Sequence, residues 1–136
     1  MRISPYITEL KSNEVFVFGS NEAGIHGAGA ALTARRKFGA KLGKGIGHVG
    51  KTYAIPTKNK KLKTLSLSRI GKYVDEFIEF AKSTPELKYF VTEIGCGLAG
   101  YKASDIAPLF KNAIYVENIY LPHSFWKTIQ TNTNKL

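Results

Sequence analysis

The sequence is poor in residues that would hold a disulfide or a metal ion. Cys96 is the only cysteine among 136 residues, which excludes an internal disulfide and a cysteine-based zinc site. No apolar run is long enough to span a bilayer, and the N-terminus lacks the apolar core of a signal peptide. We therefore expect a cytoplasmic protein with no membrane association, no metal site and no cofactor.

Acidic residues are also scarce. Ten Asp and Glu stand against 20 Lys and Arg, which gives a formal net charge of +10, and segment 35–63 contains ten Lys and Arg but no acid. Such an excess attracts a nucleic acid or a small phosphorylated ligand, although a basic surface can also serve solubility alone. Eight Phe and seven Tyr support a globular core, in what we expect to be one domain spanning residues 1–136.

Apolar patterning predicts an alternation of strands and helices. Strands are expected over residues 15–18, 53–57 and 88–94, and within 114–121. Helices are expected over 28–38, from a Ser66 or Ser68 cap to Lys82, from Ser104 or Asp105 to Lys111, and over 124–129. This order predicts an α/β fold, a three-layer α/β/α sandwich around a mixed, largely parallel sheet. Residues 1–13 fit either an edge strand or a short helix, and the tail from about 130 to 136 is expected to fray.

Five glycines between residues 39 and 51 predict a loop in this segment. Gly45, Gly47 and Gly50 have the spacing of the dinucleotide-binding fingerprint. That fingerprint needs a strand before it and a helix after it, whereas here a loop precedes and a strand follows, so we exclude a Rossmann site. A mobile basic flap over an anionic ligand is the expectation that remains.

Two strands run directly into glycine-rich turns, each of which is followed by a helix. The first turn contains Gly19, Gly24, Gly27 and Gly29, and the second spans residues 95–101. Such turns expose backbone N–H groups at the positive end of a helix, where phosphate binds. Both turns follow the C-terminal ends of strands, so they can line one crevice if the strands are neighbours. A diphosphate is the ligand that two such turns would hold.

These motifs, taken in order, resemble those of macrodomains, the ADP-ribose-binding family. The first motif is Asn21 followed by Gly27-Ala28-Gly29-Ala30, and the second is Ile94-Gly95-Cys96-Gly97-Leu98-Ala99-Gly100-Tyr101. Two shorter motifs are similar to those of one macrodomain branch, which contains the terminal ADP-ribose protein glycohydrolase and the ADP-ribose-1″-phosphate phosphatases. They are Lys37-Phe38-Gly39 and Thr57-Lys58. Uncharacterised phage and bacterial proteins have similar loops. The resemblance covers residues 15–121.

The resemblance implies binding of ADP-ribose or a related ADP-ribosyl nucleotide, with hydrolysis of an ADP-ribosyl bond or a terminal phosphate as the associated chemistry. Asn21 and His26 are the candidate catalytic residues, Asn21 to orient the distal ribose or a water and His26 as an acid or base. Each has a structural alternative as a plain turn or loop residue. The implied ligand-binding residues are Gly19, Ser20, Gly27, Ala28, Gly29, Ala30, Thr57, Lys58, Gly95, Cys96, Gly97, Leu98, Ala99, Gly100 and Tyr101.

One position departs from the family pattern. The glycohydrolase has a catalytic Asp after its Gly-Cys-Gly-Leu turn, where this chain has Ala99. Two alternatives to a hydrolase therefore stay open: a non-enzymatic sensor or sequestering protein for such a nucleotide, as in a phage or bacterial conflict factor, and a nucleic-acid-binding protein that uses its basic surface. Among the acids near the loops, Asp105 fits a helix cap, whereas Glu22 and Glu93 remain candidates for a base.

Overall fold

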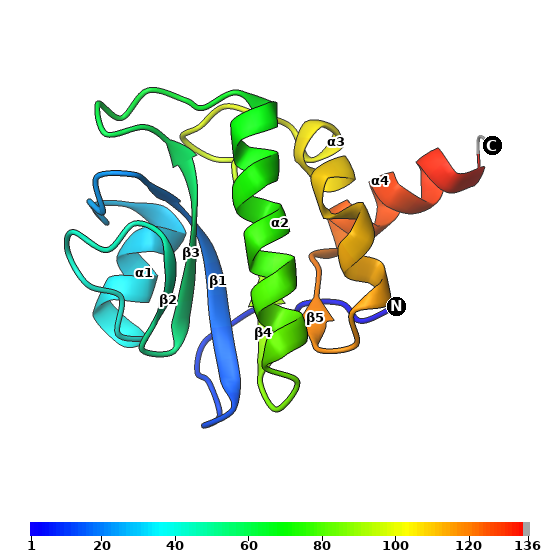
Figure 1. Ribbon diagram of the computed structural model, residues 1–136, viewed down its shortest axis with the longest axis horizontal. Helices are drawn as coiled ribbons and strands as arrows, with labels where there is room; N and C mark the ends of the chain where they lie inside the picture. Colours follow the sequence, from blue (N-terminus) through cyan, green and yellow to red (C-terminus); the bar gives the residue numbers. More distant parts are fainter. Residues whose placement is uncertain (135–136) are drawn as a thin grey trace.

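The computed structural model describes residues 1–134 as a three-layer α/β/α sandwich (Figure 1). Five strands lie in the order β2-β3-β1-β4-β5. All neighbouring pairs are parallel except β2 and β3, which confirms the predicted mixed, largely parallel sheet. The elements are β1 (Glu14–Asn21), α1 (Gly29–Lys37), β2 (Gly47–Val49), β3 (Thr52–Lys58), α2 (Leu67–Ser83), β4 (Lys88–Val91), α3 (Ala103–Ile106), the 3-10 helix η1 (Ala107–Tyr115), β5 (Ile119–Tyr120) and α4 (His123–Asn134).

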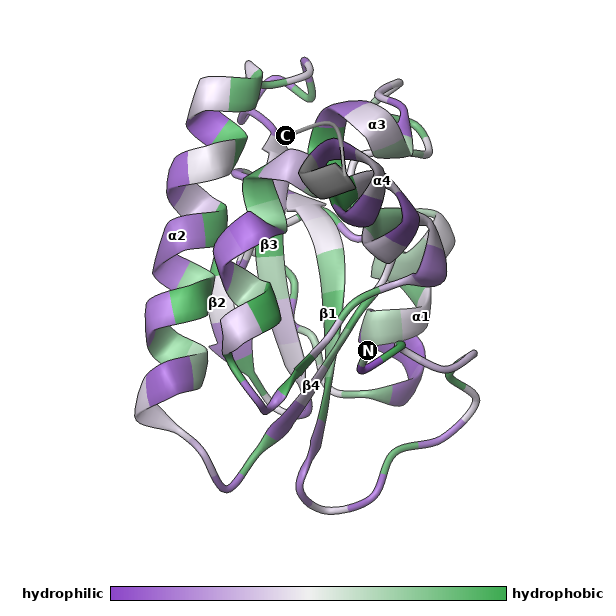
Figure 2. Ribbon diagram, turned by 90° about the vertical axis from the view of Figure 1, so that its right-hand side faces the viewer, coloured by the Kyte–Doolittle hydropathy of each residue, from purple (hydrophilic) through white to green (hydrophobic). Residues whose placement is uncertain are grey.

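Strand β1 lies at the centre of the sheet because it is apolar on both faces. Val15 and Val17 belong to the core on the α2 side, whereas Phe16 and Phe18 belong to the core on the α1 side. This is the two-residue alternation of a pleated strand. Figure 2 shows α1 and α2 on opposite sides of the sheet. A shift of one residue in the register would exchange the two sets of side chains, so packing on both faces fixes the register.

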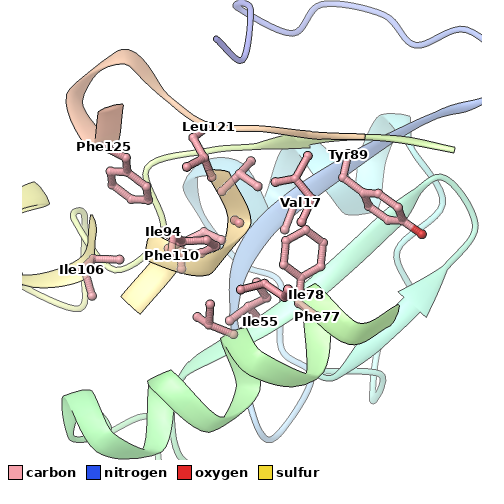
Figure 3. Close-up of a cluster of buried hydrophobic side chains, with 14 of the residues drawn as sticks. Val17, Ile55, Phe77, Ile78, Tyr89, Ile94, Ile106, Phe110, Leu121 and Phe125 are labelled. Atoms are coloured by element: carbon pink, nitrogen blue, oxygen red, sulfur yellow. The ribbon is translucent and has the colours of Figure 1, made fainter. Parts of the chain in front are cut away.

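The larger core lies between the sheet and α2, η1 and α4 (Figure 3). Helix α2 begins after Ser66, whose hydroxyl accepts a hydrogen bond from the Arg69 amide at 3.2 Å. Its Phe77 ring lies 5.0 Å from the Tyr53 ring and 5.4 Å from the Tyr89 ring, measured between centroids. Burial of one such ring contributes about 1.5–3 kcal/mol. Phe77 is therefore a core residue, as its helical spacing predicts, and Tyr73 and Phe80 pack against the same core while partly buried.

The segment before β1 is neither the edge strand nor the short helix considered from the sequence. Ile3 forms a single parallel bridge with Leu121. The Arg2 guanidinium donates to the carbonyl oxygens of Ile114, Val116 and Ile119 at 2.9–3.0 Å. The beginning of the chain thus runs beside the end of β5 and satisfies carbonyl groups there, which protects an edge that would otherwise expose unpaired backbone.

Several predicted ends differ from the observed ones. The strand predicted over 88–94 stops at Val91, because the chain turns at Thr92 and the Ile94 amide donates to the Thr92 carbonyl at 2.7 Å. The helix predicted to end at Lys111 is instead α3 followed by η1, where Pro108 lacks the amide that an α-helix would need. Helix α4 runs past the expected residue 129 to Asn134. The tail that was predicted to fray from about residue 130 is therefore helical as far as Asn134. Residues 135–136 lie outside the described residues.

The glycine-rich segment 39–51 is not the expected loop throughout, because it contains β2, which pairs with β3. The Ser20 hydroxyl donates to the Gly45 carbonyl. A Cβ at Gly45 would lie 2.0 Å from the Asn21 carbonyl oxygen, so this close approach requires glycine. The segment supports the first glycine-rich loop from behind and does not cover it as a flap.

Candidate functional site

The two glycine-rich loops meet at the carboxyl ends of the strands. Strands β1 and β4 are parallel neighbours, so the loops that follow them leave the sheet side by side. Figure 1 shows the β4–α3 loop beside the β3–α2 loop at the upper end of the sheet. A cavity of about 630 Å³ lies between the first and second glycine-rich loops. It is lined by Gly19, Ala28, Gly29, Ala30, Ala31, Thr57, Thr92, Glu93, Ile94, Gly95, Cys96, Gly97, Leu98 and Ala99.

Backbone amides dominate the chemistry of this cavity. Helix α1 starts at its wall with no side-chain cap and no acid in its first turn. Within residues 1–134, no backbone hydrogen bond uses the amides of residues 29–31, and the bonds of the second loop use those of Cys96, Gly100 and Tyr101 but not those of 97–99. Unpaired amides at the positive end of a helix attract an anion.

The glycines of the cavity keep it open and hold its shape. A Cβ on Gly97 would meet no atom within 4 Å, so it would project into open space. Gly29 has φ +57, and Gly95 has φ +78. A Cβ on Gly95 would lie 2.9 Å from the Ile106 Cδ1 atom. Glycine is therefore needed at 95 for packing, whereas at 97 it leaves room for a ligand.

A smaller cavity of about 220 Å³ adjoins the first and is lined by residues from three loops. It shares Gly19, Ala28, Ala31, Thr57 and Leu98 with the larger cavity. Its other lining residues are Ser20, Asn21, Ile25, Gly27, Lys58 and Leu62. The two hollows together form one continuous site at the carboxyl ends of β1, β3 and β4.

Asn21 lies at the smaller cavity, but its side-chain amide is occupied. Its Nδ2 atom donates to the Ile25 carbonyl at 2.8 Å, and its Oδ1 atom accepts from the Ile25 amide at 3.0 Å. Both bonds close the first loop on itself, which matches the turn role that was the alternative to catalysis, although Asn21 does not have a positive φ.

His26 is placed away from both cavities. Its side chain is fully buried, and its ring lies 5.4 Å from the Phe18 ring in an edge-on contact. Both ring nitrogens lack a hydrogen-bond partner within the described part of the chain. Burial lowers the imidazole pKa, and the charge of Arg35 lowers it further. The Lys44 backbone raises this pKa in part, but it forms no hydrogen bond with the ring. His26 is therefore a neutral packing residue beneath the loop and is not positioned as an acid or base.

Two of the three candidate acids have structural roles. Glu22 accepts hydrogen bonds from the Tyr73 hydroxyl and from Arg69, the latter at 3.0 Å. The Tyr73 hydrogen bond is the main reason that the Glu22 pKa is lowered, and Arg69 adds to it. Asp105 accepts from the Lys102 amide at 3.0 Å, so it caps α3 from the third helical position, and the N-cap itself is Lys102 and not Ser104 or Asp105.

Glu93 is the acid among residues 1–134 that lines the larger cavity, and its Oε2 atom accepts from the Ser124 hydroxyl at 3.0 Å. Cys96 also lines this cavity. Burial raises the pKa of the Cys96 thiol, and the charges of Glu93 and Asp105 raise it further. The thiol thus stays protonated and is a poor nucleophile. No cluster of three or more metal-ligating side chains occurs in residues 1–134.

The remaining predicted residues divide between the cavities and the core. Ser20, Gly27 and Lys58 line the smaller cavity, but Gly100 and Tyr101 line neither. The Tyr101 hydroxyl donates to the Leu65 carbonyl at 2.7 Å, and its ring packs against the core. Sequence reasoning did not assign five further lining residues to the site, namely Ile25, Ala31, Leu62, Thr92 and Ile94. Ile94 begins the second motif and could have been included, whereas Ile25 and Leu62 are loop residues with no pattern of their own.

Comparison with known proteins identifies the architecture and no activity. No family model matches the sequence, and no curated protein matches it. A solved structure from Bacteroides thetaiotaomicron, described as a protein of unknown function, superimposes with a TM-score of 0.60 over 85% of this chain and 88% of that chain, at 18% identity. This similarity supports the α/β/α fold alone. No helix within residues 1–134 has both the length and the apolar character to cross a membrane.

Proposed function

We propose that this protein binds ADP-ribose or a closely related ADP-ribosyl nucleotide, with the diphosphate in the larger cavity. The observation that carries the proposal is the meeting of two glycine-rich loops whose amides at residues 29–31 and 97–99 have no partner among residues 1–134. The adenosine and ribose parts of the ligand rest on the resemblance of the loop motifs to macrodomains.

The charge of the molecule supports an anionic ligand. The net charge is +10, and Lys58 lines the adjoining smaller cavity. The α1 dipole adds positive potential where the helix begins, and such a terminus favours an anion by about 0.3–1 kcal/mol at an exposed site. Glu93 is the opposing charge, but it is exposed to solvent and paired with Ser124.

The placement of the polar side chains favours binding over turnover. Ala99 stands where the glycohydrolase that the motifs resemble has its catalytic Asp, the Asn21 side-chain amide is hydrogen bonded to Ile25, and His26 lies outside the cavities. Among the candidate groups, only Glu93 meets the requirement that a general base lie within reach of the ligand. We therefore propose a nucleotide sensor or sequestering protein, with Glu93 as the residue to test for any residual hydrolysis.

The test is calorimetric titration with ADP-ribose of the wild type, Gly97→Val and Gly29→Leu. Both glycines line the cavity, and a Cβ on either would meet nothing within 4 Å, so we expect each substitution to weaken binding at least about a hundredfold by occupying the phosphate position. Gly29→Leu also loses about 1–2 kcal/mol of stability, because Gly29 has a positive φ. Gly97→Val has no such penalty, since Gly97 does not have a positive φ.

Gly43→Leu is the matched control for backbone strain. Gly43 has φ +83, a Cβ there would meet nothing within 4 Å, and it lines neither cavity. It should be destabilised like Gly29→Leu and bind like the wild type. If the wild type fails to bind ADP-ribose, or if Gly97→Val binds with unchanged affinity, the proposal is wrong.

Two further arms address the alternatives. Incubation with ADP-ribosylated protein and with ADP-ribose-1″-phosphate should give no product, whereas product that disappears in Glu93→Gln would establish an enzyme. Titration with a single-stranded polynucleotide tests the basic surface. We expect weak binding, because the exposed tyrosines, Tyr6 and Tyr115, lie outside the basic segment 35–63 and cannot form a stacking platform within it.

A further inference from the structure

Three exposed apolar side chains surround the smaller cavity. Ile25 is 47% exposed, Leu62 is 46% exposed and Leu98 is 79% exposed, and all three line this hollow of about 220 Å³. They come from the β1–α1, β3–α2 and β4–α3 loops, so their meeting follows from the fold and not from proximity in the sequence. Single exposed apolar residues need no explanation, but a group of them around a hollow is typical of a ligand site.

The β3–α2 loop holds Leu62 in an unfavourable conformation beside this cavity. Leu62 has φ 63 and is the non-glycine residue with positive φ among residues 1–134, which for a leucine costs about 1–2 kcal/mol. The Asn59 Oδ1 atom accepts from the amides of Lys61 and Lys63 at 2.8 and 3.1 Å. These bonds fix the turn, so the loop retains Leu62 at the cavity between two lysines.

The polar side chains at the same cavity are already hydrogen bonded, apart from Lys58. Asn21 is paired with Ile25, the Ser20 hydroxyl donates to Gly45, and the Thr57 hydroxyl donates to the Ser20 carbonyl at 3.3 Å. A ribose placed here would exchange water for few protein partners, and unmade hydrogen bonds are costly. A planar, apolar ring suits this lining better.

We propose that the smaller cavity binds the second heterocycle, the one other than adenine, of an ADP-containing dinucleotide whose diphosphate lies in the larger cavity. This second ring is uncharged. This inference rests on the proposed function and specifies its substrate class. The two cavities share five lining residues, so one ligand can extend through both. A volume of about 220 Å³ is below the roughly 300–1,000 Å³ of a pocket for a drug-sized molecule, and fits one ring of a larger ligand. Lys58 at the wall disfavours a cationic ring.

The experiment compares the affinities of NADH, NAD⁺ and ADP-ribose by calorimetric titration. We expect NADH to bind about tenfold more tightly than ADP-ribose, because its reduced nicotinamide ring covers apolar surface. NAD⁺, whose ring is cationic, should bind more weakly than NADH. The variants Leu62→Ser and Ile25→Ser, at residues that line the smaller cavity and not the larger one, should each reduce the preference for NADH over ADP-ribose to within about twofold while changing ADP-ribose affinity little.

Leu42→Ser is the matched control, because Leu42 is 67% exposed and lines neither cavity. It should keep the NADH preference. If ADP-ribose binds and NADH binds no more tightly, the inference is overturned while the proposed function stands. A preference that survives in Leu62→Ser and Ile25→Ser also overturns it, because the ring would then lie elsewhere. If none of the three nucleotides binds, the proposed function fails as well.

Discussion

Among single residues, His26 is the buried polar group whose hydrogen-bonding capacity is least used. A buried donor or acceptor without a partner costs about 1–3 kcal/mol, and both ring nitrogens of His26 lack one within the described chain. Its ring lies under the first loop and packs against the Phe18 ring in a T-shaped contact. The imidazole therefore contributes shape, and its polarity opposes folding.

Replacement of His26 by leucine, which has a similar size, should stabilise the protein. We expect His26→Leu to raise the free energy of unfolding by about 1 kcal/mol at about pH 8. The pKa of His26 is lowered in the folded state, so below its ordinary value of 6.5 the unfolded chain takes up a proton that the folded chain resists. The wild type thus loses stability as the pH falls, and the gap to His26→Leu should widen at about pH 5.

Urea unfolding at the two pH values measures both effects. A His26→Leu variant that is less stable than the wild type at each pH would mean that His26 has a partner that holds it in place. ADP-ribose affinity should be unchanged in this variant, since His26 lines neither cavity. Loss of affinity with retained stability would return His26 to the site.

The site residues that could be predicted from the sequence are glycines, which act through the conformation of their backbone. Gly29, Gly95 and Gly97 lie at the cavity where a strand–turn–helix pattern places them, because glycine spacing reports directly on turn geometry. The burial of His26 and the cavity position of Leu62 were not predictable. Both depend on contacts between loops that are distant in the sequence, and a loop histidine or a leucine among lysines has no periodicity to interpret.

Between elements, the first loop is attached to α2 by Glu22. The carboxylate accepts hydrogen bonds from Tyr73 and Arg69, and its side chain is 15% exposed. A hydrogen bond to a charged group contributes more than one between neutral groups. This contact connects the loop after β1 to α2, and so it helps to fix the wall of the smaller cavity.

Removal of the Glu22 charge should destabilise the fold in a pH-dependent way. The Glu22 pKa is lowered from its ordinary value of 4.5 in the folded state, so its contribution is complete above that value and is lost as the pH falls through the folded pKa. We expect Glu22→Gln to be about 1 kcal/mol less stable than the wild type at about pH 7. The difference should narrow as the pH falls below 4.5, as measured by urea unfolding.

Glu79→Gln serves as the control for a simple loss of charge on α2. Glu79 pairs with Lys82 at 3.2 Å, but both side chains are more than half exposed, so this pair should contribute almost nothing. A Glu22→Gln variant that behaves like Glu79→Gln would show that the contact of Glu22 with Tyr73 and Arg69 does not stabilise the loop.

The elements with a regular apolar period were predicted closely, and those set by pairing partners were not. Ser66, one of the two predicted caps, is the N-cap of α2, and the predicted end at Lys82 lies one residue before Ser83, because five buried side chains repeat along one face. Strand β2 was missed because its three residues, Gly47–Val49, pair with β3 without an apolar pattern. Strand β4 was predicted too long since Ile94, although apolar, belongs to the turn that lines the cavity.

For the whole molecule, the net charge of +10 should determine how fast an anionic nucleotide arrives. Lys60, Lys61 and Lys63 are exposed on the β3–α2 loop beside Leu62 of the smaller cavity. Charges near a site accelerate the encounter with an oppositely charged ligand, and salt removes the effect once the Debye length is short. The lysines of this loop should therefore act on association more than on dissociation.

We expect the triple variant Lys60→Gln, Lys61→Gln, Lys63→Gln to lower the association rate of a fluorescent ADP-ribose analogue about three- to tenfold at low salt, with the dissociation rate within about twofold of the wild type. The triple variant Lys88→Gln, Lys111→Gln, Lys127→Gln removes the same charge from exposed residues that line neither cavity. Stopped-flow traces of both should converge with the wild type at about 0.5 M salt. Equal slowing in the two variants would mean that net charge alone steers the ligand, because a local field must depend on where the lysines lie.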